Sequence, residues 1–406
     1  DILAQDSIFI FIETTINVNN EPDPLYTDRI LFDTGDNQQD VQLVTLVRDA
    51  TFIFPNRDPI TREIDNLVLN GQSTTIKGRF LEDNELNFSK SKPYVIYGYA
   101  AVPEGKTLLI EPGASIHFHS NSGLIIDKGA SLKVNGTIDE KVTFEGDRLE
   151  NAFRNIPGQW GTIWMRAGSQ ENEVHHAVIK NGGVGILVDS IPSNINPTLT
   201  ITNTELYNHS NFGILGRETS IEGYNLVVGN AGQSSFAGTI GGHYQFIHST
   251  FANYWNNSFR ALPAVLINNF FTYSNSNGET IIESRDLNNA TFTNCIIEGN
   301  NNIEFVLDKV QGNAFNYQVT NSLIRFNDIN NSYSNNAELN FNNSNYQNIL
   351  LNGQPDFRQP FDNDFIIGEK STAINAAMPS MFSLDILGID RTTAPDIGAY
   401  QHIVFD

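Results

Sequence analysis

The feature that most constrains this chain is a series of short apolar runs between Leu108 and Met165. They read LLIEPGASIHF, GLIIDKGASLKVNG, KVTFEG and PGQWGTIWM. Apolar residues alternate with small or polar residues inside each run, which is the period of a β-strand. A short strand cannot bury its apolar face alone, so runs that recur at a near-constant spacing predict a solenoid of stacked coils.

The runs continue beyond Met165, and one position can be followed from run to run. The residues at that position are Ile179, Leu206, Val227, Phe251, Phe270, Ile296 and Leu323. Their separations of 27, 21, 24, 19, 26 and 27 residues fit a parallel β-helix, in which strands stack ~4.8 Å apart while loops vary in length. Parallel strands need right-handed crossovers, so we predict an all-β chain with a right-handed parallel β-helix over residues 108–330. A β-propeller would need a period of ~40–50 residues, and no such period is evident.

Asparagine recurs close to the same position in successive runs. The asparagines concerned are Asn203, Asn225, Asn253, Asn268, Asn294 and Asn321. Asparagine tolerates the left-handed backbone conformation of tight turns, and stacked side-chain amides can form ladders. We therefore expect amide bonds between coils, with chance placement in an Asn-rich chain as the alternative.

The segments on either side of the repeats are less regular. Residues 1–50 contain three runs that read as antiparallel strands, Ser7–Ile16, Arg29–Phe32 and Val41–Val47. We interpret them as the C-terminal part of an immunoglobulin-like β-sandwich, with a small sheet packed against the solenoid as the alternative. Residues 51–107 are predicted to form a connector and N-terminal cap, because a solenoid end is an exposed sheet edge. Residues 331–406 read as an irregular module that closes the solenoid.

The net charge and the cysteine count exclude some classes of partner and site. The 406 residues carry a net charge of -22, which repels nucleic-acid phosphates and anionic lipid headgroups. We therefore expect no nucleic-acid partner, although many acidic proteins are acidic only for solubility. The single cysteine, Cys295, excludes an intramolecular disulfide and a cysteine-based zinc site. It lies in the apolar run ATFTNCIIEG, which indicates a buried packing thiol.

The quoted motifs resemble a known group of proteins. LLIEPGASIHFHSNSGLIIDKGASLKVNGTIDEKVTFEGDR followed by IPGQWGTIWM resembles surface right-handed β-helix proteins of Bacteroidota. PDF, DFII, STAINAA, GIDR and APDIGAYQ are similar to the closing module of that group, and DSIFIFIETTI resembles its preceding immunoglobulin-like domain. The resemblance covers about residues 93–402. Thr162 stands where the group has Gly, Asn375 where it has Asp, and Gln401 where it has Glu.

The resemblance implies a location more than a reaction. It implies an exported envelope protein on the extracellular face of the outer membrane, tethered as a lipoprotein through a cysteine upstream of Asp1. Membrane association is then expected only through that lipid anchor, because no run of the chain reaches the ~20 apolar residues of a membrane helix. The β-helix fold supports lyases, hydrolases, adhesins and structural subunits alike, so the fold does not identify an activity.

The acidic and basic side chains form no evident catalytic grouping in the sequence. A pectinase-type hydrolase needs carboxylates close together on one strand face. The acids of the predicted coil strands are scattered, namely Glu111, Asp127, Glu145, Asp189, Glu205, Glu222 and Glu298. The pair Asp362 and Asp364 lies in the closing module and reads as a solvated turn. Five basic residues are candidates for one groove, namely Arg148, Arg154, Arg166, Lys180 and Arg217.

His117 and His119 are candidates for metal binding. Strand alternation places both on one face, and a neighbouring coil would have to supply a third ligand. His175 and His176 lie on opposite faces, so only one of them can contribute. Surface histidines are the plainer interpretation, and we predict neither a metal nor another cofactor.

Aromatic residues and short motifs give the remaining candidates. Trp160 and Trp164 are expected to pack in the core or at corners, whereas Tyr254 and Trp255 are expected to form an exposed contact surface. The tripeptides DSI at Ser7 and Ser190 match the O-glycosylation pattern of the same bacterial group.

These observations favour a non-catalytic cell-surface protein over an enzyme. The first hypothesis is a scaffold or docking subunit of an outer-membrane transport, secretion or biogenesis complex, with outer-membrane proteins as partners. The second is a polysaccharide-binding or polysaccharide-degrading surface protein, with a glycan as ligand. The third is an adhesin.

Overall fold

A computed structural model of the chain describes residues 25–32, 39–46, 49–189 and 196–405. The chain divides into two compact units, residues 1–51 and 52–406. In the first unit, β1 (Leu25–Phe32) and β2 (Gln39–Leu46) form an antiparallel hairpin. The predicted strand Ser7–Ile16 lies outside the described residues, so the immunoglobulin-like assignment stays a prediction. Within the described ranges, no helix is long and apolar enough to cross a membrane.

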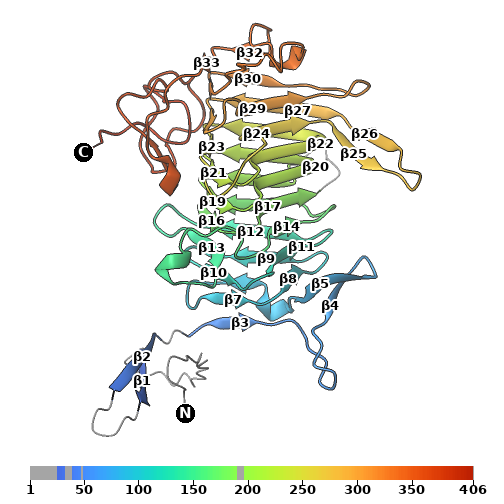
Figure 1. Ribbon diagram of the computed structural model, residues 1–406, viewed down its shortest axis with the longest axis vertical. Helices are drawn as coiled ribbons and strands as arrows, with labels where there is room; N and C mark the ends of the chain where they lie inside the picture. Colours follow the sequence, from blue (N-terminus) through green and yellow to red (C-terminus); the bar gives the residue numbers. More distant parts are fainter. Residues whose placement is uncertain (1–24, 33–38, 47–48, 190–195, 406) are drawn as a thin grey trace, which may run out of the picture. The chain divides into compact units, whose positions relative to one another are not determined.

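The second unit is a right-handed parallel β-helix, as the repeats predict (Figure 1). Its coils contribute strands to three stacked columns, and the first column is a sheet of eleven strands within the described residues. The strands of this first sheet are β3 (Thr51–Ile53), β7 (Tyr94–Ile96), β10 (Ser115–Phe118), β13 (Val142–Gly146), β16 (Ala177–Lys180), β19 (Glu205–His209), β21 (Val227–Ala231), β23 (Thr250–Asn253), β28 (Ile296–Gly299), β31 (Leu323–Ile324) and β33 (Leu350–Leu351).

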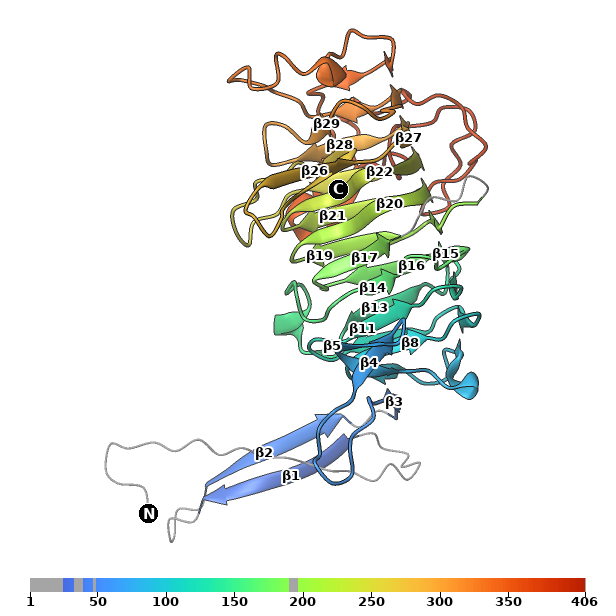
Figure 2. The same ribbon diagram turned by 90° about the vertical axis from the view of Figure 1, so that its right-hand side faces the viewer.

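The other two columns of strands belong to a second sheet of the solenoid. The second column contains β5 (Gln72–Phe80), β8 (Tyr99–Val102), β11 (Gly123–Ile126), β14 (Ile163–Met165), β17 (Val184–Asp189), β24 (Val265–Asn268) and β29 (Phe305–Asp308). The third contains β6 (Asn87–Phe88), β9 (Thr107–Ile110), β12 (Ser131–Asn135), β15 (Asn172–His175), β18 (Leu199–Thr202), β27 (Leu287–Thr293), β30 (Gln318–Thr320) and β32 (Tyr346–Gln347). Two long strands, β20 (Phe212–Tyr224) and β22 (Ser234–Ile247), run through both columns. Figure 2 shows these coils stacked from β8 to β29.

Several smaller elements decorate the coils. β4 (Asn66–Leu69) pairs with β5 through a turn at Asn70 and Gly71, which both have positive φ. β25 (Phe270–Ser274) and β26 (Thr280–Ser284) form an antiparallel hairpin. The short 3-10 helices are η1 (Asp83–Glu85), η2 (Asn151–Phe153), η3 (Ala337–Leu339) and η4 (Pro360–Asp362).

The apolar position predicted to run along the coils is partly correct. The row that points into the core of the first sheet is Ile179, Leu206, Val228, Phe251, Ile297 and Ile324. Val227, Ile296 and Leu323 were each assigned one residue too early and lie on the outward row, while Phe270 lies in the β25–β26 hairpin. The error has a physical cause, because the outward row is also apolar where another segment covers it. Alternation then cannot tell the two faces apart.

The covering segment is residues 353–405, here called the C-terminal module. It contains β34 (Phe357–Gln359), η4 and β35 (Asp364–Ile367). Phe365 packs on Val227 and Ala252, and further along Ile367 packs on Ile296. The module therefore lies along the side of the solenoid, beside β19 to β33, rather than closing its end (Figure 1).

The end of the solenoid is covered by the polar, turn-rich segment after β31. Its aromatic side chains turn inward, and Phe341 lies 5.0 Å from Phe326 and 4.6 Å from Tyr346 between ring centroids. Leu339 of η3 is buried beside them. This cap protects the last coil from pairing with other chains.

The predicted asparagine ladder exists at the corner that leads from the third column into the first sheet. Equivalent positions in seven coils have φ between 47° and 56°, and we call this set the asparagine corner: His176, Asn203, Asn225, His248, Asn294, Asn321 and Asn348. Asn225 donates to Asn203 over 3.0 Å, and Asn294 donates to His248 over 3.0 Å. Asn253 and Asn268 were wrongly included, since they bond to backbone groups at other corners.

Candidate functional site

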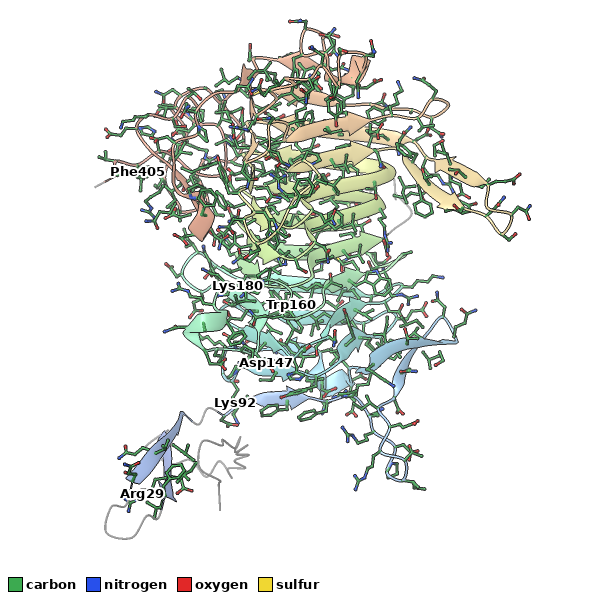
Figure 3. The ribbon with its side chains drawn as sticks, in the orientation of Figure 1. Arg29, Lys92, Asp147, Trp160, Lys180 and Phe405 are labelled. Carbon is green, nitrogen blue, oxygen red and sulfur yellow. The ribbon has the colours of Figure 1, made fainter. Side chains whose placement is uncertain are left out.

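The outward side of the first sheet changes character along the solenoid. Beneath the C-terminal module it is apolar, whereas between β7 and β16 it carries polar side chains and is bordered by the loop that contains η2. We call the outward side of β7, β10, β13 and β16 the open face. Figure 3 shows Lys180 and Asp147 on this side of the molecule, below the C-terminal module.

Three ionisable residues form a charged row across the open face. His117, Glu145 and Lys180 occupy paired positions on β10, β13 and β16. Glu145 accepts from Lys180 Nζ over 2.8 Å, and its other oxygen lies 3.7 Å from His117 Nδ1. All three side chains are buried or half-buried by their neighbours, so their polar atoms are held in fixed positions.

An aromatic stack borders the charged row. Phe54, Tyr97 and His119 each follow their strand by one residue, because β3, β7 and β10 stack in register. The ring centroids are 4.8 Å apart for Phe54 and Tyr97, and 4.4 Å apart for Tyr97 and His119. The next coil places Asp147 at the same position, where its carboxylate bonds His119 Nδ1 over 2.7 Å. Phe54 is 53% exposed, so the stack is open to solvent at that end.

A small pocket of about 230 Å³ adjoins the charged row, between β13, β16 and the loop containing η2. Arg148, Arg154 and Lys180 line it, together with Glu145 and Asn181. Arg148 lies 3.8 Å above the Phe153 ring and donates to Glu150, whose carboxylate raises the pKa of the guanidinium. The pocket therefore places two guanidinium groups and one ammonium group, all hydrogen-bond donors, beside the Glu145 carboxylate.

The expected basic groove is thus correct for three residues and wrong for two. Arg166 pairs with Asp127, and Arg217 pairs with Asp189, at the corner between the second and third columns. Neither residue reaches the open face. The sequence spacing could not separate the two groups, because loops of different length return the chain to different corners.

The histidines have carboxylate partners rather than a third metal ligand. His117 faces Glu145 and His119 bonds Asp147, while His175 lies in the third column, where its Nδ1 contacts Thr202 Oγ1 at 2.7 Å. His176 belongs to the asparagine corner, and burial lowers its pKa. Across residues 49–189 and 196–405, no three His, Cys, Asp or Glu side chains converge as a metal site would require.

Tyr254 and Trp255 do not form the exposed surface expected of them. Trp255 is only 5% exposed, and its indole donates to Ser258 Oγ over 3.0 Å. Tyr254 packs edge-on against Phe357 and Phe361 of the C-terminal module, and burial raises its pKa. The module, which returns from about a hundred residues further along the chain, covers this pair, and local sequence gives no sign of that.

The other singled-out residues have structural environments. Trp160 is buried, stacks on Phe118 with centroids 4.4 Å apart and donates to the Lys180 carbonyl, as core packing predicts. Cys295 is fully buried, and burial raises the pKa of its thiol to about 12. Asp364 pairs with Arg358 at 2.6 Å. Ser7 and Ser190 lie outside the described residues.

Phe54 and Tyr97 were missed in the sequence. The only local signal is the alternation in TFIF, residues 51–54, which places Phe52 and Phe54 on one side of a strand. The predicted connector at residues 51–107 is wrong in part, because β3 and β7 belong to the first sheet. Recognising two more coils would have aligned Phe54, Tyr97 and His119.

No protein-family model matches the chain, and no curated protein sequence matches it. Among solved structures, the crystal structure of pectate lyase Pel9A aligns with 13% identity over 88% of this chain and 98% of its own, with a TM-score of 0.33.

Proposed function

We propose that this chain is a non-catalytic surface β-helix protein that binds a polysaccharide along its open face. One observation carries the proposal: the aromatic stack and the charged row lie next to each other on successive strands of the first sheet, outside the part that the C-terminal module covers. An elongated ligand that lies along the solenoid axis meets both rows at the strand spacing.

The two rows supply complementary interactions for a sugar chain. Aromatic rings offer apolar contact to the C–H faces of sugar rings, with little loss of side-chain entropy. Carboxylate, ammonium and guanidinium groups supply several acceptors and donors for hydroxyl groups. Because Glu145 already bonds Lys180 and the His117 side chain is mostly buried, little ordering is needed on binding.

Affinity gel electrophoresis tests this proposal. The full chain is run through gels that contain polygalacturonate, alginate, xylan or mannan. At least one polysaccharide is expected to retard the wild-type protein, and the Phe54→Ala/Tyr97→Ala variant is expected to lose that retardation. Phe259→Ala removes an exposed ring from another region and serves as the control. Migration that none of the four polysaccharides changes would refute the proposal.

Docking to a protein of the outer membrane is a second candidate function, and one observation favours it. Phe259 is 89% exposed, yet its neighbour Arg260 is almost fully buried and bonded to Glu304 at 2.5 Å. The loop therefore presents an apolar ring on a fixed backbone, as interface anchors do. Pull-down from solubilised outer membranes should recover a partner that Phe259→Ala loses. Recovery of the same proteins by both variants would exclude this role for Phe259.

Cellular location is part of the proposal. We propose outer-membrane placement through a lipid anchor upstream of Asp1, with O-glycans on Ser7 and Ser190. Protease accessibility on intact cells, combined with the mass of the native protein, tests both points. A protein that is protected in intact cells and has the mass of its sequence would contradict them.

A further inference from the structure

A second hollow lies at the corner between the second and third columns, far from the open face in the coil. It has a volume of about 700 Å³ and lies between this corner and the β25–β26 hairpin, so we call it the hairpin groove. Figure 1 shows the hairpin projecting beside β22. The floor includes Asp189, Arg217 and Thr239, and the wall includes Phe270 and Phe271.

The hairpin is anchored to the solenoid rather than hanging free. Arg285, directly after β26, donates its backbone N–H to the Asn269 carbonyl over 2.9 Å. Its guanidinium lies 3.4 Å from the Glu218 carboxylate on β20. Ser284 Oγ donates to Asn313 over 2.6 Å. Contacts on both sides of the hairpin base therefore hold the groove open before any ligand arrives.

The floor of the hairpin groove contains a strained residue. Ile240 has φ of 64°, in the left-handed region that β-branched residues rarely adopt. Its N–H donates to Asn268 Oδ1 over 3.0 Å, and Gly241 and Gly242 continue the turn. Strain of this kind persists where surrounding structure enforces it and is concentrated at ligand-binding sites.

The polar groups of the floor are fixed and electrically balanced. Asp189 accepts from Arg217 Nε over 2.5 Å and Nη2 over 2.6 Å, and from Trp164 Nε1 over 2.8 Å. Arg285 faces Glu218 at the far side. Two carboxylates thus offset two guanidinium groups, so the groove has no excess charge to attract an ionic ligand.

The wall of the hairpin groove is aromatic. Phe271 is 50% exposed, and its ring stacks beside Tyr273 with centroids 5.7 Å apart. One apolar wall facing a rigid floor of carboxylate, guanidinium, hydroxyl and amide groups is suited to a ligand with an apolar face and hydroxyl edges. The volume lies within the ~300–1,000 Å³ typical of sites for small ligands.

We propose that the hairpin groove is a second carbohydrate site, which takes a short neutral oligosaccharide. A sugar ring stacks on Phe271, while its hydroxyl groups bond the Asp189–Arg217 pair, Thr239 and Glu218. The site shares no residue with the open face, so it can hold a branch or a second chain while the open face holds another. Its neutral ligand distinguishes it from a site for uronic acids.

Isothermal titration calorimetry on the full chain tests the proposal. The probes are cellotetraose, xylotetraose, mannotetraose and tetragalacturonate. We expect at least one neutral tetraose to bind more tightly than tetragalacturonate, and Phe271→Ala to weaken that binding at least tenfold. Glu218→Gln keeps the size of the side chain and is expected to weaken it severalfold. Phe259→Ala is the matched control, because it removes an exposed ring outside the groove.

Failure of this proposal is distinguishable from failure of the open-face proposal. Tyr97→Ala should leave the tetraose binding that depends on Phe271 unchanged, since Tyr97 belongs to the aromatic stack of the open face and not to the hairpin groove. Absence of binding by the three neutral probes, preference for tetragalacturonate, or full affinity in Phe271→Ala would each overturn the proposal. A protein that binds polysaccharide in gels but shows any of these results has only the open-face site.

Discussion

Asn294 and Met378 are joined by a reciprocal pair of hydrogen bonds. Asn294 Nδ2 donates to the Met378 carbonyl over 2.8 Å, and the Met378 N–H donates to Asn294 Oδ1 over 2.9 Å. The same amide also donates to His248 in the neighbouring coil. Asn225 and Asn321 contact the C-terminal module in a similar way, through the carbonyls of Leu384 and Ala376. The asparagine corner is therefore both a ladder between coils and the attachment line of the module.

Asn294→Ala should loosen the C-terminal module. The variant leaves two partly buried backbone groups of Met378 without their partner and places alanine in the left-handed region, so we expect a loss of about 2 kcal/mol in unfolding free energy. Denaturant titration measures the loss, and hydrogen exchange should rise in residues 376–384. Asn331→Ala is the control, because Asn331 also has φ of 55° but is exposed. Equal losses in both variants would show that only backbone strain matters.

The asparagine corner has a local role in each coil turn and a long-range role in attaching the C-terminal module, and only the local role could be predicted from the sequence. Asn203, Asn225, Asn294 and Asn321 were found from their periodicity, because a local turn requirement repeats in every coil. His176 and His248 lie at the same corner and interrupt the series of asparagines, so a period of asparagine does not reveal them, although histidine is also enriched in the left-handed region. The module contacts were not predictable, because Asn225 and Leu384 are 159 residues apart.

His248→Asn should make the protein more resistant to acid. Burial lowers the pKa of His248 to about 3, whereas the unfolded residue takes up a proton near pH 6.5. The unfolded state thus binds more protons below pH 6.5, and stability falls as pH falls toward 3. Asparagine occupies the equivalent position in the coils on both sides, so the variant should gain about 2 kcal/mol at pH 5 and little at pH 8. Parallel pH curves for variant and wild type would contradict this assignment.

Glu298 should make the protein less stable as the pH rises, whereas His248 makes it less stable as the pH falls. It is 1% exposed, and burial raises its pKa to about 7, with Arg325 3.9 Å away opposing the shift. The native state therefore keeps a proton that the unfolded state has lost, so stability should fall as pH rises from about 4.5 through 7. Glu298→Gln should remove that slope and be the more stable protein at pH 8. Thermal unfolding across pH 4–9 measures the difference, and Glu279→Gln at the exposed hairpin tip should follow wild type.

For the candidate sites too, the sequence predicts features that depend on neighbouring residues and misses features that depend on contacts between distant segments. Arg148, Arg154 and Lys180 could not be separated from Arg166 and Arg217 in the sequence, because only the folded coils show which corner each loop returns to. The hairpin groove was not predictable, because Phe270 was assigned to a coil and its wall was therefore placed in the core. The prediction that Tyr254 and Trp255 are exposed was wrong because their loop has no local sign of burial. The C-terminal module, which covers Tyr254, comes from a distant part of the sequence.

Arg260 and Glu304 provide a test of how the Phe259 loop is held. The two residues are 4% and 0% exposed, and the Arg260 guanidinium also donates to the carbonyls of Asn253 and Leu262. Arg260→Met leaves the Glu304 carboxylate buried without its partner, which should reduce the unfolding free energy by about 3–5 kcal/mol. The Arg260→Met/Glu304→Leu variant removes both charges and should recover more than half of that loss. If the double variant is no more stable than Arg260→Met, the bonds from Arg260 to backbone carbonyls hold the loop, and the ion pair does not.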